Sequence, residues 1–405
     1  MNILFIDSGL PMSDRSSADL RMYTILELLA GQGHECHYFI NNYTGWSQNK
    51  VSPADLIRYR HSLEALSIQL HTHNMDRTLL NYDFDVIYFK YFYPAEKTIT
   101  SIRLLQLNAR IVIDSVDIVY ARLLAKATLE NNSDFYVEAE SIKNRELATY
   151  TQADLIVTIT PEDTDCLKQN LPDINTFIIP NIHEIHVADV EKTPFPSLVF
   201  IGVFSHEPNV DGVLYFYHEI WPQIIKSHPD THWIIIGGNP PPQIQRLDCS
   251  NIEVMGYVPE TLPYLKKSWI SIAPLRFGAG MKGKVGEAMA AGIPVITTDF
   301  GAQGLDVRNG EQLLIATTAD EYAEQINDLI VDSDKRKYIG TQGQLFIESH
   351  YSTQAVSIIL EKFINTLEKL PLKHMYLYSK IYRFSRQLKL WIDQQIMWRF
   401  KGNKI

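Results

Sequence analysis

Three glycines in one short stretch of the chain have a spacing that brings backbone close to a ligand. Gly278, Gly280 and Gly283 form a G-x-G-x-x-G pattern, in which glycine lets a loop turn tightly and expose its N–H groups to a phosphate. The same stretch carries the basic residues Arg276, Lys282 and Lys284. Arginine can bind two phosphate oxygens at once and lysine adds a mobile charge, so this loop predicts a binding site for a diphosphate.

The residues that follow the loop predict a helix beginning near Lys284, whose positive end faces the same space. Glu287 lies one turn into this helix, where its carboxylate can accept hydrogen bonds from ribose or sugar hydroxyls. The simpler alternative is a solvated surface on which Glu287 pairs with Lys284 at the i, i+3 spacing. Three cations beside a glycine-rich turn favour the ligand site over that alternative.

The glycine spacing is also typical of NAD-binding loops, and Asp299 lies at the distance where such a loop has its acidic partner. A dinucleotide-binding fold, however, places this loop after its first strand, with several strands still to follow. Only two strand-like runs, IPVITT and QLLIA, come after Gly283. The loop therefore lies late in its domain, and we set the NAD interpretation aside.

Strand-like apolar runs alternate with helical patterns along most of the chain. The runs of the first half are NILFID, CHYFI, VIYFK, ARIVID, LIVTIT and TFIIP, and those of the second half are SLVFIG, HWIIIGG, IEVMG, WISIAP, IPVITT and QLLIA. This alternation predicts an α/β protein with two doubly wound, Rossmann-like domains. We expect an N-terminal domain at 1–185, a linker at 186–196, a C-terminal domain at 197–350, a helix at 351–370 and a tail at 371–405.

Composition limits the classes of protein to which this chain can belong. Its 405 residues are 45% hydrophobic and 21% charged, with three separated cysteines, no long apolar run and no signal-peptide pattern at the start. These features predict a cytoplasmic protein of two domains without disulfides or a cysteine zinc site. The net charge of −10 argues against nucleic acid as a partner.

The stretch PLRFGAGMKGKVGEAMAAGIPVITTDFGAQGL resembles the donor-site region of family 4 glycosyltransferases, which have the GT-B fold. Similar segments, from NILFIDSGLPMSDRSSADLRM to MGYVPE, follow in the family's order, and only residues from about 371 fall outside the resemblance. The resemblance implies two Rossmann-like domains that face a central cleft, with the acceptor side N-terminal and the donor side C-terminal. It also implies transfer of a sugar from a nucleotide diphosphate with retention of configuration, without a metal or other cofactor.

The family's functional residues are carried over only where the motifs match. The resemblance implies catalytic roles for Arg276, Lys282, Glu287 and Asp117, with the cations stabilising the departing diphosphate. The donor-binding residues that it implies, together with those of the loop itself, are Gly202, His206, Asn209, Tyr257, Val258, Gly278, Gly280, Met281, Gly283 and Lys284.

Several positions depart from the family pattern. The first glutamate of the family's E-x7-E motif is replaced by Ala279. An arginine and a lysine that many members carry after the first donor-domain strand are replaced by Val203 and Asn209, for which Lys282 and Lys284 are the candidate substitutes. The family's histidine–aspartate pair appears here as DSVD, so Asp117 is its nearest match.

On the acceptor side, Asp14, Arg21 and Lys90 lie at predicted strand ends, where such folds place ligands, although each fits a surface charge equally well. We expect no metal site. Three D-x-D pairs, beginning at Asp83, Asp163 and Asp332, fit helix caps or strand starts. His71 and His73, with His61 ten residues earlier, do not form a metal cluster, because adjacent-but-one histidines on a helix point apart and no carboxylate pair completes them.

The tail at 371–405 is basic and has an amphipathic pattern. Leu377, Ile381, Phe384, Leu388 and Trp391 share one helical face, and eight basic residues oppose one acidic residue between positions 371 and 405. Such a helix fits either the headgroup region of an anionic membrane or a packing site on protein. Lys380, Tyr382, Arg383, Arg386, Lys389 and Trp398 are the flanking residues that suit a membrane surface.

Three function classes stay open. The favoured one is a glycosyltransferase that moves a sugar from a UDP- or GDP-sugar to a glycan or lipid-linked glycan, in the cytoplasm or on the inner face of the cytoplasmic membrane, in surface polysaccharide synthesis. A sugar-nucleotide epimerase of GT-B shape would act on the donor alone. A non-catalytic relative would bind the nucleotide without turnover, as the loss of the first glutamate allows.

Overall fold

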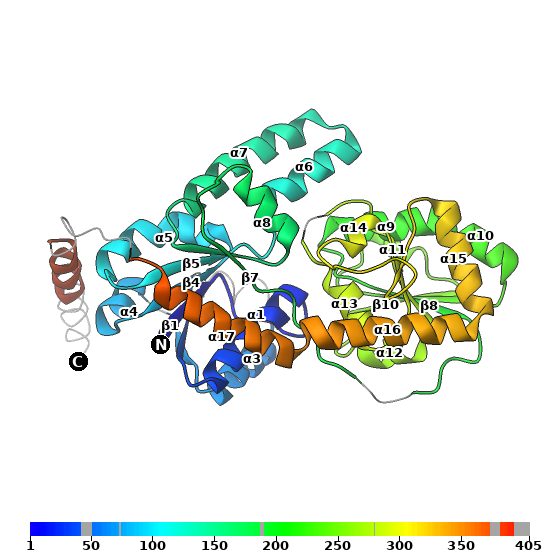
Figure 1. Cartoon of the computed structure of the whole chain (residues 1–405), viewed down its shortest axis with the longest axis horizontal. Helices are drawn as coiled ribbons and strands as arrows, with labels where there is room; N and C mark the ends of the chain where they lie inside the picture. The colour runs from blue at the N-terminus through cyan, green and yellow to red at the C-terminus, as the bar shows by residue number, and fades with distance from the viewer. Residues whose placement is uncertain (42–50, 73, 187–189, 279, 373–380, 393–405) are drawn as a thin grey trace, which may run out of the picture.

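The computed structural model of the chain describes residues 1–41, 51–72, 74–186, 190–278, 280–372 and 381–392. Within them the chain forms two parallel α/β sheets, each covered by helices on both faces (Figure 1). We call the part that carries the first sheet the N-terminal domain and the part that carries the second the C-terminal domain. The predicted pair of doubly wound domains is confirmed.

The first sheet has seven parallel strands in the order β3-β2-β1-β4-β5-β6-β7. Its strands are β1 (Asn2–Asp7), β2 (Glu35–Ile40), β3 (Gln69–His71), β4 (Val86–Lys90), β5 (Arg110–Asp114), β6 (Leu155–Thr158) and β7 (Thr176–Ile178). The four strands β1, β4, β5 and β6 are almost entirely buried, as their continuous apolar runs require when both sheet faces are covered. The helix expected around His71 is wrong, because this residue ends the edge strand β3.

Helices connect these strands and cover them. They are α1 (Ser17–Gly31), α3 (Pro53–Ala65), α4 (Met75–Asn81), α5 (Phe92–Leu105), α6 (Val119–Glu130), α7 (Ser133–Tyr150) and α8 (Pro161–Lys168). The α6–α7 pair extends beyond the sheet as a helical hairpin (Figure 1).

The second sheet has six parallel strands in the order β10-β9-β8-β11-β12-β13. They are β8 (Ser197–Ile201), β9 (His232–Ile236), β10 (Ile252–Gly256), β11 (Ile270–Ala273), β12 (Val295–Thr297) and β13 (Leu314–Ile315). The helical segments of this domain are α9 (Glu207–Tyr215), the π-helix η1 (Phe216–Ile220), α10 (Trp221–Ser227), α11 (Pro242–Gln245), α12 (Leu262–Lys267), α13 (Gly283–Ala290), α14 (Asp299–Ala302), α15 (Ala319–Val331) and α16 (Ser333–Tyr351).

The last long helix, α17 (Thr353–Lys369), leaves the C-terminal domain and returns to the N-terminal one (Figure 1). Val356, Leu360 and Phe363 are buried in the same apolar cluster as Phe5 and Tyr38 of the first sheet. The chain therefore crosses between the domains twice.

No helix in the described parts of the chain is both long enough and apolar enough to cross a bilayer.

Candidate functional site

The glycine-rich loop leads directly into α13, as the sequence predicted, with Lys282 at the N-cap position. Gly278 has a φ of 144° and Gly280 a φ of 67°, so both adopt backbone conformations that residues with a Cβ rarely accept. These two glycines are therefore needed for the path of the loop. Ala279, the replacement for the family's first glutamate, lies outside the described residues.

Arg276 is held in place by a carboxylate of the same domain. Its Nε donates a hydrogen bond of 2.9 Å to Asp211 on α9, and its Nη2 bonds the other oxygen of the same carboxylate. The guanidinium also lies 5.0 Å from the centre of the Tyr215 ring. The side chain of Arg276 is 41% exposed, so its charge is oriented but remains accessible to a ligand.

Lys284 projects from α13 to the carboxyl end of β8, where its ammonium bonds the Asn209 side chain at the start of α9. The ammonium lies 4.5 Å from the centre of the Phe200 ring. A Cβ added to Gly202 would stand 2.7 Å from the Lys284 Nζ and 2.8 Å from the Asn209 Cγ. Gly202 therefore leaves the space that this cation occupies.

Burial lowers the pKa of both loop lysines. It lowers the pKa of Lys282 to about 8, although the charges of Asp163 and Asp117 raise it. Burial also lowers the pKa of Lys284 to about 7, in the same direction as the charge of Lys282 and against that of Glu287. An anion placed beside these ammonium groups would favour their charged forms, because its negative charge compensates for the hydration that the buried lysines have lost.

Glu287 lies one turn into α13 and accepts a hydrogen bond from the Thr261 hydroxyl that precedes α12. Burial raises the pKa of Glu287, whereas the bond from Thr261 and the charge of Lys284 lower it. In the neighbouring loop after β10, Val258 is buried and Tyr257 is 48% exposed. The loop after β10 thus presents an aromatic ring beside the helix that carries the carboxylate.

Residues of the N-terminal domain face the glycine-rich loop from the end of β5. A Cβ at Gly280 would lie 3.6 Å from the Val116 carbonyl oxygen and 3.8 Å from the Asp117 Cβ. Val116 has a φ of 60°, which is a strained conformation for a β-branched residue and is typical of functional sites. Asp117 accepts a hydrogen bond of 2.7 Å from Arg122 Nε, which orients its carboxylate.

Asp163, in the first turn of α8, is a further carboxylate at this place. Its Oδ2 would lie 4.0 Å from a Cβ at Gly280 and has no hydrogen-bond partner among the described residues. Burial raises the pKa of Asp163 to about 6, in the same direction as the charge of Asp117, while the Thr160 hydrogen bond and the charge of Lys282 lower it. Two N-terminal carboxylates therefore lie near Lys282 of the C-terminal domain.

Three helices begin at this junction. A Cβ at Gly283, the first residue of α13, would be 2.4 Å from the Cβ of Ser17, the first residue of α1. His206 is the exposed N-cap residue of α9. At the first residue of α9, Glu207 forms an ion pair of 2.6 Å with Lys126 on α6. The positive ends of α1, α9 and α13 thus face one region between the domains.

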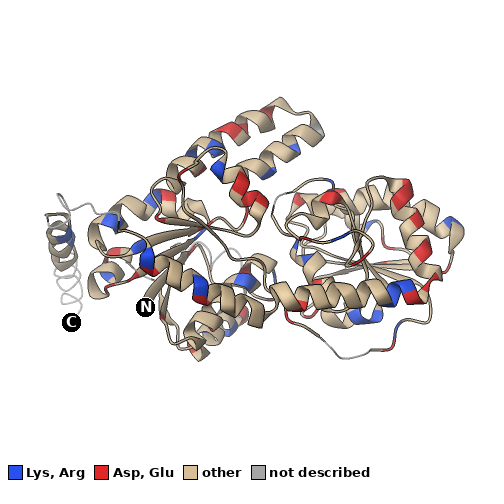
Figure 2. Cartoon of the chain, in the orientation of Figure 1, with Lys and Arg blue, Asp and Glu red and all other residues tan. Residues whose placement is uncertain are grey.

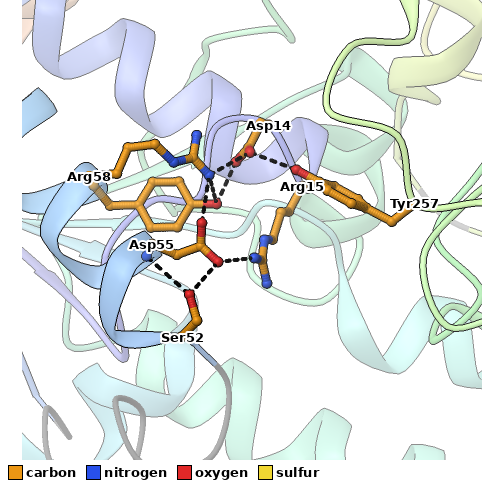
Figure 3. Close-up of polar contacts among 7 residues, drawn as sticks. Asp14, Arg15, Ser52, Asp55, Arg58 and Tyr257 are labelled. Atoms are coloured by element: carbon orange, nitrogen blue, oxygen red, sulfur yellow. Dashed lines mark hydrogen bonds and ion pairs between the residues drawn. The ribbon is translucent and has the colours of Figure 1, made fainter.

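The predicted acceptor-side residue Asp14 belongs to a polar network that joins the domains (Figure 3). Its carboxylate accepts hydrogen bonds from Arg58 at 2.8 Å, from Tyr59 at 2.5 Å and from Tyr257 of the C-terminal domain at 2.9 Å. Burial raises the pKa of Asp14, but these three bonds hold it below its ordinary value. The Arg15 guanidinium lies 5.7 Å from the centre of the Tyr257 ring, so both neighbouring residues contact the same tyrosine.

The other two residues expected on the acceptor side are neither surface charges nor exposed ligands. Arg21 is 1% exposed, with its guanidinium bonded to Asp114 at 2.5 Å and to the carbonyl of Ile179 at 2.7 Å. Lys90 is 4% exposed and forms ion pairs with Asp7, at 3.2 Å, and with Asp19. Each side chain neutralises a buried carboxylate at the end of a strand, so the interpretation as a surface charge is wrong, while a ligand role stays a prediction.

Four residues that contact the predicted set had not been identified as partners. They are Ser17, Asp163, Asp211 and Thr261. Asp163 lies in the first turn of α8, at the helix start that the sequence predicts, and the position of this helix after the buried strand β6 also indicates the carboxyl edge of the sheet. The sequence gives no sign of the other two contacts, because Ser17 lies 266 positions from Gly283 and Thr261 lies 26 positions from Glu287.

Nothing in the described residues indicates a metal centre: no group of three or more histidine, cysteine or acidic side chains is arranged to hold an ion. Asp332 caps α16 by accepting a hydrogen bond from the backbone of Lys335, as the sequence predicted for one D-x-D pair. His71 stacks on the buried His37, with 2.9 Å between their ring nitrogens, while His73 lies outside the described residues.

Residues 195–332, which include the glycine-rich loop, match the protein-family model described as "Glycosyl transferases group 1". The chain is 25% identical over 169 residues to the "Uncharacterized 44.6 kDa protein in cps region" of Klebsiella pneumoniae, which is 40% of this chain and 44% of that protein. It is 27% identical over 165 residues to "Spore coat protein SA" of Bacillus subtilis, which is 36% of this chain and 43% of that protein. The matches thus span less than half the length of these curated relatives.

Solved structures resemble the chain over nearly its whole length. A sucrose-phosphate synthase from Thermosynechococcus elongatus has a TM-score of 0.67 at 14% identity, and the match covers 91% of this chain and 99% of that one. The Anabaena protein HepE, solved in complex with UDP and glucose, has a TM-score of 0.62 at 16% identity and covers 90% and 100%. The predicted GT-B fold is confirmed, and with the domain match it supports a glycosyltransferase.

Proposed function

We propose that this protein is a family 4 glycosyltransferase, which transfers a sugar from a UDP- or GDP-sugar to a glycan or lipid-linked glycan acceptor with retention of configuration. What supports the proposal is the position of Lys282 and Lys284 at the start of α13, beside the starts of α1 and α9, with Arg276 held against α9 by Asp211. Such a site is suited to a group that gains negative charge as it leaves, which is what a nucleoside diphosphate does. A role in surface polysaccharide synthesis fits the name of the Klebsiella relative.

The cations are arranged to act on the diphosphate. Arg276, oriented by Asp211, offers its free donors to phosphate oxygens, while Lys282 and the first N–H groups of α13 approach from the loop. Lys284 reaches the end of β8 beside Gly202 and Asn209. It therefore supplies a positive charge in the region where many family members have an arginine or a lysine and this chain has neither.

The remaining side chains of the site suit the rest of the donor and the acceptor. Glu287 is placed to accept hydrogen bonds from the ribose, and Tyr257 and Val258 lie in the loop that would hold the base. Asp117 lies across the glycine-rich loop, on the side from which an acceptor hydroxyl would approach. Because the fixed cations can balance the leaving group's charge, we propose that the reaction needs no metal.

A donor screen tests this proposal directly. UDP- and GDP-sugars are incubated with the full-length protein, with and without candidate lipid-linked and free glycans, and release of the nucleoside diphosphate is measured in EDTA. We expect release that depends on the acceptor, with a loss on the order of 10²- to 10³-fold in Lys282→Ala. Lys267→Ala, at an exposed lysine of the same domain, is the matched control. Conversion of the donor without an acceptor would indicate an epimerase, and nucleotide binding without turnover would indicate a non-catalytic relative.

A further inference from the structure

The helix formed by residues 381–392 lies at the edge of the N-terminal domain, near α4 (Figure 1). Tyr382 packs at the margin of an apolar core cluster of that domain, and its hydroxyl accepts a hydrogen bond of 2.7 Å from Arg386. Arg386 forms an ion pair of 3.3 Å with Asp76 on α4, and Arg383 lies 3.9 Å from Asp83. The docked side of the helix is thus mainly polar and basic.

The opposite side is apolar and points away from the protein. Its residues and their exposed fractions are Ile381 at 73%, Phe384 at 67%, Leu388 at 46%, Trp391 at 58% and Ile392 at 42%. The spacing of three and four residues places them on one face, which a helix of a soluble protein normally buries in its own core. Here the polar contacts with α4 hold the polar side of the helix against the domain. None of this chain's described residues therefore buries the apolar face.

From this orientation we infer that residues 381–392 form a docking surface for an anionic membrane. The helix has no acidic residue, and its basic residues are Arg383, Arg386 and Lys389 (Figure 2). The two arginines contact the N-terminal domain, whereas Lys389 is exposed. The whole segment from 371 to 405 has eight basic residues and one acidic residue, in a chain of net charge −10. Apolar residues that enter the acyl boundary and basic residues that meet anionic headgroups are the combination that holds a helix in the plane of a membrane surface.

The size of the face argues against a second copy of the chain as its partner. A helix of 12 residues is about 18 Å long. With a width of about 10 Å, its face covers on the order of 200 Å², whereas a stable interface buries about 800 Å² on each partner. A membrane sets no such minimum, because each apolar side chain that enters it adds to the binding. The inference deepens the proposed function, since an enzyme docked in this way would meet a lipid-linked acceptor at the membrane.

Vesicle flotation of the full-length protein tests the inference without any assay of transfer. Vesicles of phosphatidylcholine alone are compared with vesicles that contain about one third phosphatidylglycerol, at physiological ionic strength. The variant Phe384→Gln/Leu388→Gln makes the exposed face polar without a change in charge, and Gln387→Ala is the control on the same helix. We expect the wild type and the control to bind the anionic vesicles, and the double variant to bind at least about tenfold more weakly.

Three results would overturn the inference. One is failure of the wild type to bind the anionic vesicles, and another is equal binding by the wild type and the double variant. The third is a wild-type dimer in solution that the double variant converts to a monomer, because a second copy would then cover the face. All three are independent of nucleotide release, so loss of the transferase proposal would leave the membrane result unchanged.

Discussion

Replacement of Gly283 by alanine should separate the two domains at the point where their helices meet. The added Cβ would stand 2.4 Å from the Ser17 Cβ and 2.7 Å from its Oγ. The hydroxyl can rotate away, but the Ser17 Cβ cannot, so normal carbon–carbon contact of about 3.5 Å requires the helix ends to move apart by about 1 Å. A displacement of this size between reacting groups is sufficient to lower kcat/KM on the order of 10²-fold.

The same substitution should leave the fold intact. Gly283 is not among the glycines with positive φ, and alanine is the better helix former by about 1 kcal/mol, so we expect no decrease in Tm. Nucleotide binding to the C-terminal domain should change much less than turnover, because the loop glycines and the cations are untouched. Calorimetry with the nucleoside diphosphate and steady-state kinetics on the same preparation would separate the two effects.

The second variant, Ser17→Gly, makes this prediction specific. Ser16 remains the N-cap of α1 in this variant, and removal of the Ser17 side chain costs at most about 1 kcal/mol of helix stability. We expect Ser17→Gly to restore most of the activity of Gly283→Ala in the double variant, which is the signature of a direct contact. Wild-type activity in Gly283→Ala, or no recovery in the double variant, would refute the proposed closeness of the two helix ends during catalysis.

Other substitutions and pH test the cation cluster. The pKa is lowered to about 7 for Lys284 and to about 8 for Lys282, so each side chain is charged below that pH and loses its charge above it. The affinity for UDP or GDP should therefore fall between pH 7 and 9. Calorimetry at pH 8 in buffers of different ionisation enthalpy should then show proton uptake on binding. Because Lys284→Met removes a cation that burial disfavours, it should raise Tm by at least about 2 °C while it abolishes nucleotide binding. An unchanged affinity for the nucleotide would show that Lys284 is not a ligand. Arg276→Lys loses the forked contact to Asp211 and to phosphate, so we expect kcat/KM to fall at least about tenfold, and full activity would remove Arg276 from the site.

The positions of the strands and of the glycine-rich loop could be predicted because each depends on a local pattern. Buried strands of a parallel sheet are continuous apolar runs, and the loop is marked by glycines that its backbone needs. β3 has only three residues, lies at the sheet edge and is not continuously apolar, so a pattern of this kind cannot identify it. The helix was expected from the spacing of His71 and His73, but His71 stacks against His37 of the neighbouring strand.

The partners of the site residues could not be predicted, because charge alone does not identify what a side chain faces. Arg21 on α1 and Arg276 after β11 are both arginines of the predicted site, yet one is buried against Asp114, 93 residues away, and the other remains 41% exposed. The difference depends on which carboxylates the folded sheets bring close. The tail is a similar case: its apolar face was visible in the sequence, but its direction depends on contacts between Arg386 and Asp76.

The lowered pKa values of the loop lysines link donor binding to the approach of the domains. Lys282 lies in the C-terminal domain, but the charges that raise its pKa, those of Asp163 and Asp117, come from the N-terminal domain. With the domains apart, Lys282 would lose these charges. A diphosphate between the sheets adds a stronger negative charge at the same place, and therefore holds the lysine charged where burial alone would discharge it. Only Lys282 has this link, because the contacts of Lys284 all lie within the C-terminal domain. Donor binding at Lys282 should therefore favour closure.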